Sequence, residues 1–428
     1  MVRVYDQLLL LNLFGAGTGF VTTLVLGRLL GPDGYGAYVF ALGWLNLALL
    51  VTTLGFHHFM VRALPPLRLE ERHGEMRGLL LLAVVIASLF ALALTWATPL
   101  LLDTFTVSDD PTLEQALGAA TVLLLPMTLN QMRAGLLRGA GRPVAGQAPE
   151  LALQPVLFLS ALVAAWIFGR SLDAVAVLHL LAGAVGLALL AGAVPVIATL
   201  RALPAAPIAF RARHWLVEAL TSSVVFSALV IMAATDVVVL GALSTAEETG
   251  LYGLAARFFT VMQIPVLAAA GVLSHEVARL RATGADVALA AMVRRTAGRT
   301  ALAAIGLGLL CTPVALAPEL LFGPGFAAAS TPMLVLIWSR VGEALFGNPG
   351  AVLGNGGHLR LMGVLVVVSA GLNLCLNVIL VPEFGATGAA AATAVAHLLL
   401  TLALVFAVRR HFGLLSLPLL QRAGGPPS

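Results

Sequence analysis

The sequence predicts an all-α polytopic membrane protein with about twelve transmembrane helices in two six-helix lobes, and three observations lead to this prediction. Hydrophobic residues make up 60% of the 428 residues and charged residues 10%, whereas soluble globular chains carry roughly 45 to 50% and about 25%. About twelve apolar runs approach the length of about 20 residues that a helix needs to cross the hydrocarbon. A repeat at half the length of the chain relates its two halves.

The apolar runs follow one another with short connections. Arg3 precedes the first run and no small-residue cleavage site follows it, so we expect an uncleaved helix rather than a secretory signal. The fourth run is less apolar because it contains Asn130 and Gln131. The tenth contains Arg340 and Glu343. The expected spans are 8–27, 37–61, 78–102, 114–135, 150–168, 174–200, 215–241, 249–273, 300–317, 328–352, 361–381 and 386–408.

Arginine is distributed unequally between alternate loops, and cytoplasmic loops are normally enriched in positive charge. With the N-terminus inside, 20 arginines fall on the cytoplasmic side and two, Arg28 and Arg170, fall outside. One missed or invented helix would scramble this asymmetry, so it supports both the number of spans and cytoplasmic termini. The cytoplasmic arginines are Arg3, Arg62, Arg68, Arg72, Arg77, Arg133, Arg138, Arg142, Arg201, Arg211, Arg213, Arg279, Arg281, Arg294, Arg295, Arg299, Arg360, Arg409, Arg410 and Arg422.

An internal repeat relates VLGRLLGPDGYGAYVFAL at 25–42 to VLGALSTAEETGLYGLAA at 239–256, with seven identities at an offset of 214 residues. Gly36 and Gly250 open the incoming helix in the two copies. A weaker echo, at an offset of 216, aligns Gly141 with Gly357. Because each half contains an even number of spans, the halves share one orientation and are expected to be related by a pseudo-two-fold axis along the membrane normal.

The repeat divides the chain into four expected parts. They are an N-terminal lobe at 1–200, a cytoplasmic inter-lobe linker at 201–214, a C-terminal lobe at 215–410 and a cytoplasmic tail at 411–428. The loops are too short to hold a folded soluble domain, so catalysis by a domain outside the membrane is not expected.

Four stretches, taken in order, suggest a family. They are LGRLLGPDGYGAYVFALGWLNLALLVTTLG at 26–55, TDVVVLGALSTAEETGLYGLAARF at 235–258, LLFGPGFAAASTPMLVLIW at 320–338 and NLCLNVILVPEFGATGAAAATAVAH at 373–397. In this order they resemble the bacterial polysaccharide-transport flippases, which export O-antigen and other lipid-linked oligosaccharides within the multidrug/oligosaccharidyl-lipid/polysaccharide exporter superfamily. The resemblance extends over essentially the whole chain.

The resemblance implies a transporter rather than an enzyme, working by alternating access in the bacterial cytoplasmic (inner) membrane. Its cargo would be a glycan on a polyprenyl pyrophosphate, moved from the cytoplasmic to the outer leaflet. Membrane lipid and other polysaccharide-assembly proteins are the expected partners. Nucleic acid is not expected, because the arginines are scattered over short loops rather than gathered in a patch.

Ionisable residues within spans are costly and are therefore candidates for function. Arg257 lies about eight residues into the eighth span, roughly 12 Å deep, and matches the basic position of the family's LYxxAxR-like stretch. Asp236 lies near the same depth on the preceding span. We expect either a buried structural pair or a cavity site in which substrate phosphate competes with Asp236 for Arg257.

Three further groups of charged residues have both structural and functional interpretations. Arg340 and Glu343 are three residues apart, which favours a local intrahelical pair over a cavity role. Arg28 is either an outer-side substrate contact or a headgroup anchor. Arg133 and Glu218 are expected near the cytoplasmic interface, where snorkelling explains them.

Polar uncharged and histidine residues complete the candidate set. Asn373 and Asn377 share one helical face, where interhelical hydrogen bonding is favoured and contacts with cargo sugars are the alternative. His57 and His58 are expected at the interface, with proton coupling as the alternative. His397 stands alone in apolar sequence. No histidine or cysteine spacing suits a metal, and no cofactor is expected.

Alternative functions have weaker support. A cation-coupled multidrug antiporter of the same superfamily would be expected to carry a coupling carboxylate deep in the first half, whereas Glu114 and Glu150 lie at span ends. A lipid II flippase would be expected to add two spans and a charged groove. A membrane glycan polymerase or ligase would need a sizeable external loop, which this chain lacks.

Overall fold

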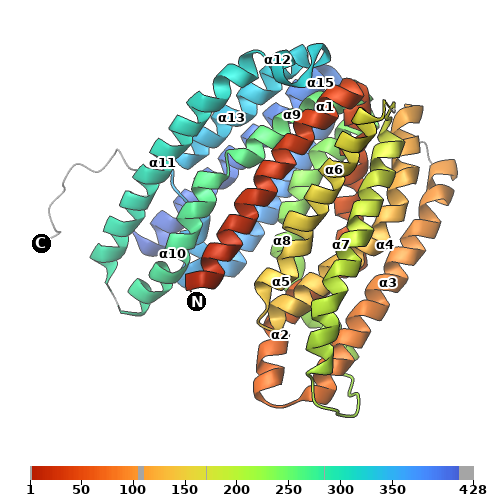
Figure 1. Cartoon of the computed structure of the whole chain (residues 1–428). Coiled ribbons are helices and arrows are strands. Elements are labelled where there is room, and N and C mark those ends of the chain that lie inside the picture. Colours follow the sequence, from red (N-terminus) through yellow and green to blue (C-terminus); the bar gives the residue numbers. More distant parts are fainter. Residues whose placement is uncertain (1, 105–109, 170, 284, 414–428) are drawn as a thin grey trace, which may run out of the picture. The chain divides into compact units, whose positions relative to one another are not determined.

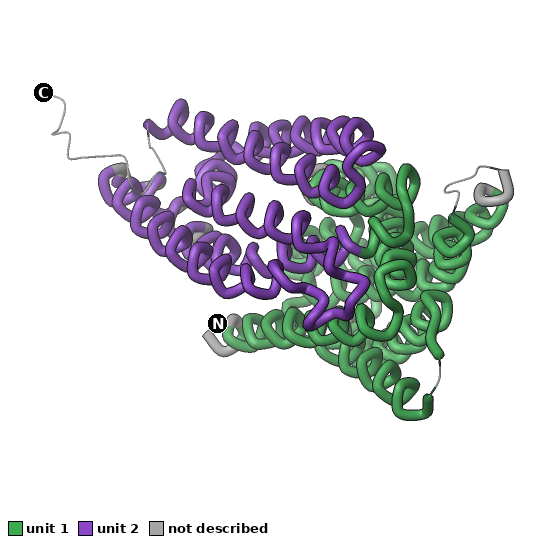
Figure 2. The backbone as a smooth tube through the Cα atoms, turned by 90° about the horizontal axis from the view of Figure 1, so that it is seen from above, with its two compact units in different colours: residues 1–250 green, residues 251–428 purple. Residues whose placement is uncertain are grey.

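The computed structural model describes residues 2–104, 110–169, 171–283 and 285–413, and every regular element within them is a helix (Figure 1). Contacts divide the chain into two compact units, residues 1–250 and 251–428 (Figure 2). The helices are α1 (Val2–Thr53), α2 (Phe56–Leu69), α3 (His73–Thr104), α4 (Pro111–Gly139), α5 (Pro143–Ala148), η1 (Pro149–Leu153), α6 (Gln154–Ile167), α7 (Ala174–Arg201), α8 (Ala212–Leu243), α9 (Ala246–Val261), α10 (Ile264–Ala282), α11 (Asp286–Leu316), α12 (Glu319–Phe322), η2 (Pro324–Ala329), α13 (Ser330–Ala344), α14 (Pro349–Leu353), η3 (Gly354–His358) and α15 (Leu359–Phe412).

Each expected span is mainly helical, although non-helical residues at 54–55, 262–263 and 345–348 interrupt the expected spans 37–61, 249–273 and 328–352. The all-α class is confirmed. Among the described residues, eight helical segments are long and apolar enough to cross a membrane. Two of them, with 48 and 64 residues, are far longer than one crossing requires. α1 changes direction at Gly31 and α15 at Gly385, where the backbone is not helical, so each joins two expected spans. The number twelve stays a prediction.

The outer faces of the helices are apolar, as lipid contact requires. On α3 and α7 the large side chains of Phe90, Trp96, Leu187 and Leu190 are exposed. A soluble monomer rarely presents apolar surface on this scale. These faces match the hydrocarbon of a bilayer, in agreement with the composition of the chain.

In unit 1 the helix α4 is central, because it packs against α1, α2, α3 and α7. Its first turn is capped by the Asp110 carboxylate, which accepts a hydrogen bond from the Thr112 amide at 2.9 Å. Asp173 caps α7 in the same way through the Ala176 amide at 2.7 Å. α8 also belongs to this unit and packs on α1, α2 and α3.

The two copies of the sequence repeat meet in unit 1. A Cβ placed on Gly36 would collide with the carbonyl oxygen of Ala246 and the amide nitrogen of Gly250. A Cβ on Gly250 would collide in turn with the Pro32 carbonyl and the Gly36 amide. The matched glycines therefore let the two helix entries touch backbone to backbone, which explains why both copies keep glycine there.

In unit 2, α13 packs against α11 and α15, and α10 packs against α11. The reversal of α15 at Gly385 is visible in its side-chain contacts, since the Ser369 hydroxyl donates to the Ala396 carbonyl at 2.9 Å. The glycines of the weaker echo share a conformation, with φ of 80° at Gly141 in unit 1 and 95° at Gly357 in unit 2.

The described units do not test the expected division into lobes at 1–200 and 215–410, which stays a prediction. Most of the expected tail, 411–428, lies outside the described residues, as does Arg170.

Candidate functional site

A two-residue break separates α1 from α2, and this break borders a pocket in unit 1. Leu54 and Gly55 separate the two helices and have φ of 44° and 75°. Glycine adopts this left-handed conformation without steric cost. A leucine there is strained by about 1–3 kcal/mol, and such strain is concentrated at functional sites. We call the cavity beside these residues the break pocket; its volume is about 100 Å³.

The break pocket is lined by polar side chains together with aliphatic ones, and no carboxylate, guanidinium or ammonium group is among its described lining residues. Its lining combines amides, hydroxyls and imidazoles, all of which can both donate and accept hydrogen bonds. The Nδ1 atom of His57 is buried and has no hydrogen-bond partner within the described part of the chain. A volume of this size holds a few waters or one small polar group. The polar residues lining the pocket are Asn46, Thr53, His57, His58, Gln131 and Ser227.

Two glycines of α4 set the position of the histidine pair. A Cβ on Gly135 would collide with the backbone of His57, and one on Gly139 would collide with the carbonyl of Met60. Spaced four residues apart, these glycines lie on one face of α4 and allow α2 to approach closely. The imidazoles of His57 and His58 lie 4.0 Å apart between ring centroids.

A largely buried ionic cluster joins α4 to η1 and α7. The Arg133 guanidinium donates to the Glu150 carboxylate at 3.1 Å and to the Asn130 amide oxygen at 3.0 Å. Asn130 in turn donates to the Val185 carbonyl at 3.4 Å. Arg133 is only 5% exposed. The snorkelling predicted for Arg133 is therefore wrong, because a carboxylate within the unit replaces the water that a snorkelling group would seek.

In unit 2 a second buried cluster joins three helices. The intrahelical pair predicted for Arg340 and Glu343 is present, with a distance of 2.6 Å between Nη1 and Oε2. The Arg340 guanidinium also lies over the Phe259 ring of α9, 3.8 Å from its centroid. His397 of α15 brings its Nδ1 within 3.8 Å of the Glu343 carboxylate. The Nε atom of Arg340 and the Oε1 atom of Glu343 are buried without a hydrogen-bond partner among the described residues.

Asn373 and Asn377 are both fully buried, inside the fold of α15. Asn377 donates to the Asn373 carbonyl at 2.9 Å, and Asn373 donates to the Thr393 hydroxyl at 3.5 Å across the hairpin. The Tyr252 hydroxyl contacts the same threonine at 3.1 Å. Interhelical hydrogen bonding, the role favoured for Asn373, is thus present.

The remaining predicted site residues are on α1, α8 and α9. Asp236 is buried at 2% exposure in α8 of unit 1, whereas Arg257 is exposed on α9 of unit 2. Their ion pair stays a prediction. Arg28 is exposed on α1, three residues before the kink at Gly31.

Two features were missed from the sequence. His397 was set aside as a lone histidine, yet it contacts both Glu343 and Phe259, whose ring centroid is 5.2 Å from the imidazole. The break pocket was also missed. Its available signal was Gly55 followed at once by two histidines inside an otherwise apolar run.

Known proteins resemble this chain in fold and in sequence pattern. The structure is similar to that of a lipid II flippase, MurJ, in an inward closed conformation, with a TM-score of 0.73 and 13% identity over 96% of this chain and 88% of that chain. It is equally similar to an inward-facing multidrug resistance MATE transporter of the MOP superfamily, with a TM-score of 0.73 and 13% identity over 94% of each chain.

An outward-facing MATE transporter matches with a TM-score of 0.57 and 15% identity over 95% of both chains. These likenesses show that the chain shares the fold of these transporters. No curated protein sequence matches the chain. A family model described as "Polysaccharide biosynthesis protein" matches residues 7–274, more than half of its length. The chain belongs to this polysaccharide biosynthesis family.

Proposed function

We propose that the protein is a flippase that moves a polyprenyl-pyrophosphate-linked oligosaccharide from the cytoplasmic to the outer leaflet by alternating access. The observation that carries this proposal is membership of the polysaccharide biosynthesis family in a chain with a transporter fold. A family concerned with polysaccharide and a fold that transports together favour a sugar-bearing cargo. The lipid-linked form follows from chemistry, because a polyprenyl tail keeps such a glycan at the membrane.

Arg257 is our first candidate for the pyrophosphate contact. Its side chain is exposed rather than packed in the core of unit 2, although its neighbour Phe258 is buried. An arginine fork donates two parallel hydrogen bonds to a phosphate and retains its charge at every physiological pH. Asp236 would hold the guanidinium between transport cycles, and Arg28 would receive the anion on the outer side.

The break pocket is our candidate for contact with a single polar group of the glycan, such as one sugar hydroxyl. Sugar hydroxyls both donate and accept hydrogen bonds, as do the Asn46 and Gln131 amides and the Ser227 hydroxyl that line it. Leu49, Leu50 and Val230 form the apolar part of its wall. The absence of a charged side chain from the described lining suits a neutral glycan unit better than a phosphate.

The other predicted residues of unit 2 have a structural role in this proposal. Arg340 and Glu343 neutralise one another, Asn373 bridges the hairpin of α15 through the Thr393 hydroxyl, and Asn377 donates to the Asn373 carbonyl within one arm of that hairpin. In this proposal these four residues keep unit 2 rigid during transport. Direct cargo contact by any of them would require the Arg340–Glu343 pair to open.

The MurJ and MATE folds match equally well, so fold alone does not separate a glycan flippase from a lipid II flippase or an antiporter. The antiporter is disfavoured because Glu150, a half-buried carboxylate of the first half, is already paired with Arg133. Family membership favours polysaccharide cargo over lipid II.

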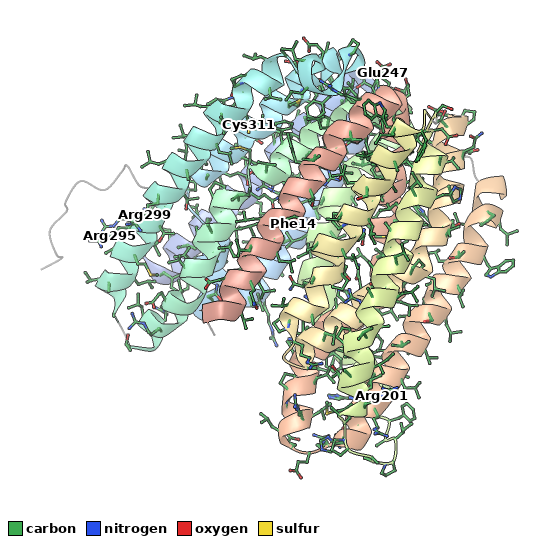
Figure 3. The ribbon with its side chains drawn as sticks, viewed as in Figure 1. Phe14, Arg201, Glu247, Arg295, Arg299 and Cys311 are labelled. Carbon is green, nitrogen blue, oxygen red and sulfur yellow. The ribbon has the colours of Figure 1, made fainter. Side chains whose placement is uncertain are left out.

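The proposal is tested by complementation of a bacterial strain that lacks its polysaccharide flippase. The wild-type chain should restore surface glycan, and Arg257→Ala, inserted at normal level, should abolish it, because the pyrophosphate loses its anchor. Arg295→Ala is the matched control, since Arg295 is an exposed arginine of α11 in unit 2 (Figure 3). The control should export normally.

Full export by Arg257→Ala would show that Arg257 is not the anion contact. Failure of the wild-type chain in strains that assemble several different glycans, despite normal insertion, would count against the flippase assignment itself. For the break pocket, Gln131→Leu should reduce export of the native glycan while leaving insertion unchanged. Equal export by Gln131→Leu and wild type would remove this pocket from the proposal.

A further inference from the structure

A second and larger cavity, of about 430 Å³, lies in unit 1 where α2, α4 and α7 end and α3 begins. We call it the rim pocket. It is bordered by turns whose arginines are predicted to be cytoplasmic, and Arg201, at the end of α7, marks this end of the unit in Figure 3. Cavities of a few hundred cubic ångströms are large enough for a ligand rather than a single water.

The floor of the rim pocket is apolar. Leu64, Met76, Leu80 and Leu136 line it and are each less than 10% exposed, so they form its deep part. Leu203 closes the floor on the side of α7. A hydrated ion gains nothing from such a surface, whereas burial of a hydrocarbon chain contributes about 0.8 kcal/mol per methylene.

The mouth of the rim pocket carries two arginines that form no ion pair within the described residues. Arg68 donates to the Ala140 carbonyl at 3.5 Å and Arg142 donates to the Thr199 hydroxyl at 3.2 Å, so each guanidinium retains further N–H groups. His73 also lines the pocket, and its Nδ1 atom is buried without a hydrogen-bond partner in the described structure.

Nearby charges do not cancel this basic mouth. The described lining holds one carboxylate, that of Glu71, against the two arginines, so the mouth keeps a net positive charge. Arg72 lies next to it in sequence but is engaged with Glu75 and Glu70, and these hydrogen bonds raise the pKa of the Arg72 guanidinium above its ordinary value. Arg68 and Arg142 are therefore the cations available to a ligand of the rim pocket.

We propose that the rim pocket binds an anionic phospholipid of the membrane leaflet, with the headgroup phosphate at Arg68 and Arg142 and an acyl chain along the apolar floor. Basic pockets between helices at the cytoplasmic face are suited to such headgroups. A free phosphate has no apolar part to cover the floor of the pocket. A glycan would find one hydroxyl, that of Thr199, among the described polar side chains of the lining.

This inference goes beyond the proposed transport and is tested without it. The full-length protein is purified and placed in nanodiscs of phosphatidylcholine or of phosphatidylcholine with phosphatidylglycerol, and lipid retained after detergent extraction is measured by native mass spectrometry. Arg68→Gln/Arg142→Gln should weaken phosphatidylglycerol retention on the order of tenfold or more, at about fivefold per arginine. Both side chains are exposed, so folding should be unaffected.

The matched control is Arg201→Gln/Arg213→Gln, which removes the same charge from exposed positions outside the rim pocket. It should retain phosphatidylglycerol like wild type. Ala202→Trp fills the pocket without changing charge and should also release the lipid. Equal retention by wild type and Arg68→Gln/Arg142→Gln would overturn the proposal.

Two further outcomes would overturn the choice of ligand. Equal loss in the Arg201→Gln/Arg213→Gln control would mean a diffuse surface effect. Protection from thermal unfolding by inorganic phosphate in phosphatidylcholine nanodiscs, equal to that by phosphatidylglycerol, would mean that the site takes a free anion and not a lipid.

Discussion

Replacing Gly36 by alanine probes the contact between the two copies of the repeat. The added methyl group would meet the Ala246 carbonyl oxygen and the Gly250 amide nitrogen. These are backbone atoms, so they cannot move aside by changing rotamer. Overpacking of this kind costs about 1–3 kcal/mol. Alanine recovers about 0.5–1 kcal/mol of that through its helix propensity. The free energy of unfolding should therefore fall by about 1 kcal/mol, and by no more than about 2.5 kcal/mol.

The assay is thermal unfolding of the detergent-solubilised protein, followed by fluorescence-detected size exclusion. Gly17→Ala is the control, because Gly17 lies in the same helix with open space around its Cβ position. Gly36→Ala should lower Tm by roughly 1–3 °C, while Gly17→Ala should leave it equal or higher. If Gly36→Ala is as stable as Gly17→Ala, the backbone contact at Gly36 is not tight and the reasoning fails.

Three other predictions use the same thermal assay. Arg340→Met and Glu343→Leu should each destabilise by about 3–5 kcal/mol because each strands a buried charge, whereas the double variant should cost far less; additive losses would contradict this. Arg133→Met should destabilise comparably by leaving the half-buried Glu150 carboxylate without its partner, and a wild-type Tm would contradict the buried pair. Asp110→Ala should cost about 1 kcal/mol through loss of the α4 cap, with Asp110→Asn as the control that keeps it.

The helical class and the spans were accessible from the sequence because bilayer thickness imposes a length on apolar runs. The bends at Gly31 and Gly385 fall in the expected connections 28–36 and 382–385. The break at Leu54 and Gly55 was not predicted, because it lies inside the expected span 37–61. The repeat indicated that Gly36 and Gly250 are equivalent, but only the structure shows that the two touch.

The candidate site was predicted where it depends on neighbours in sequence and missed where it depends on packing. The Arg340–Glu343 pair followed from a spacing of three residues. His397 lies 54 residues beyond Glu343, and no periodicity connects them. Arg133 was misplaced because a hydropathy pattern cannot show that Glu150 supplies a partner within the unit.

Direct measurement of flipping in liposomes tests the central claim most closely. The purified protein is reconstituted with a polyprenyl-pyrophosphate-linked oligosaccharide, and exposure of the glycan on the opposite leaflet is followed with an externally added lectin or glycosidase. We predict that wild type exposes the glycan faster than protein-free liposomes, that Arg257→Ala does not, and that Arg295→Ala behaves as wild type. A wild-type rate no faster than that of empty liposomes, for lipid-linked glycans of several structures, would contradict the account.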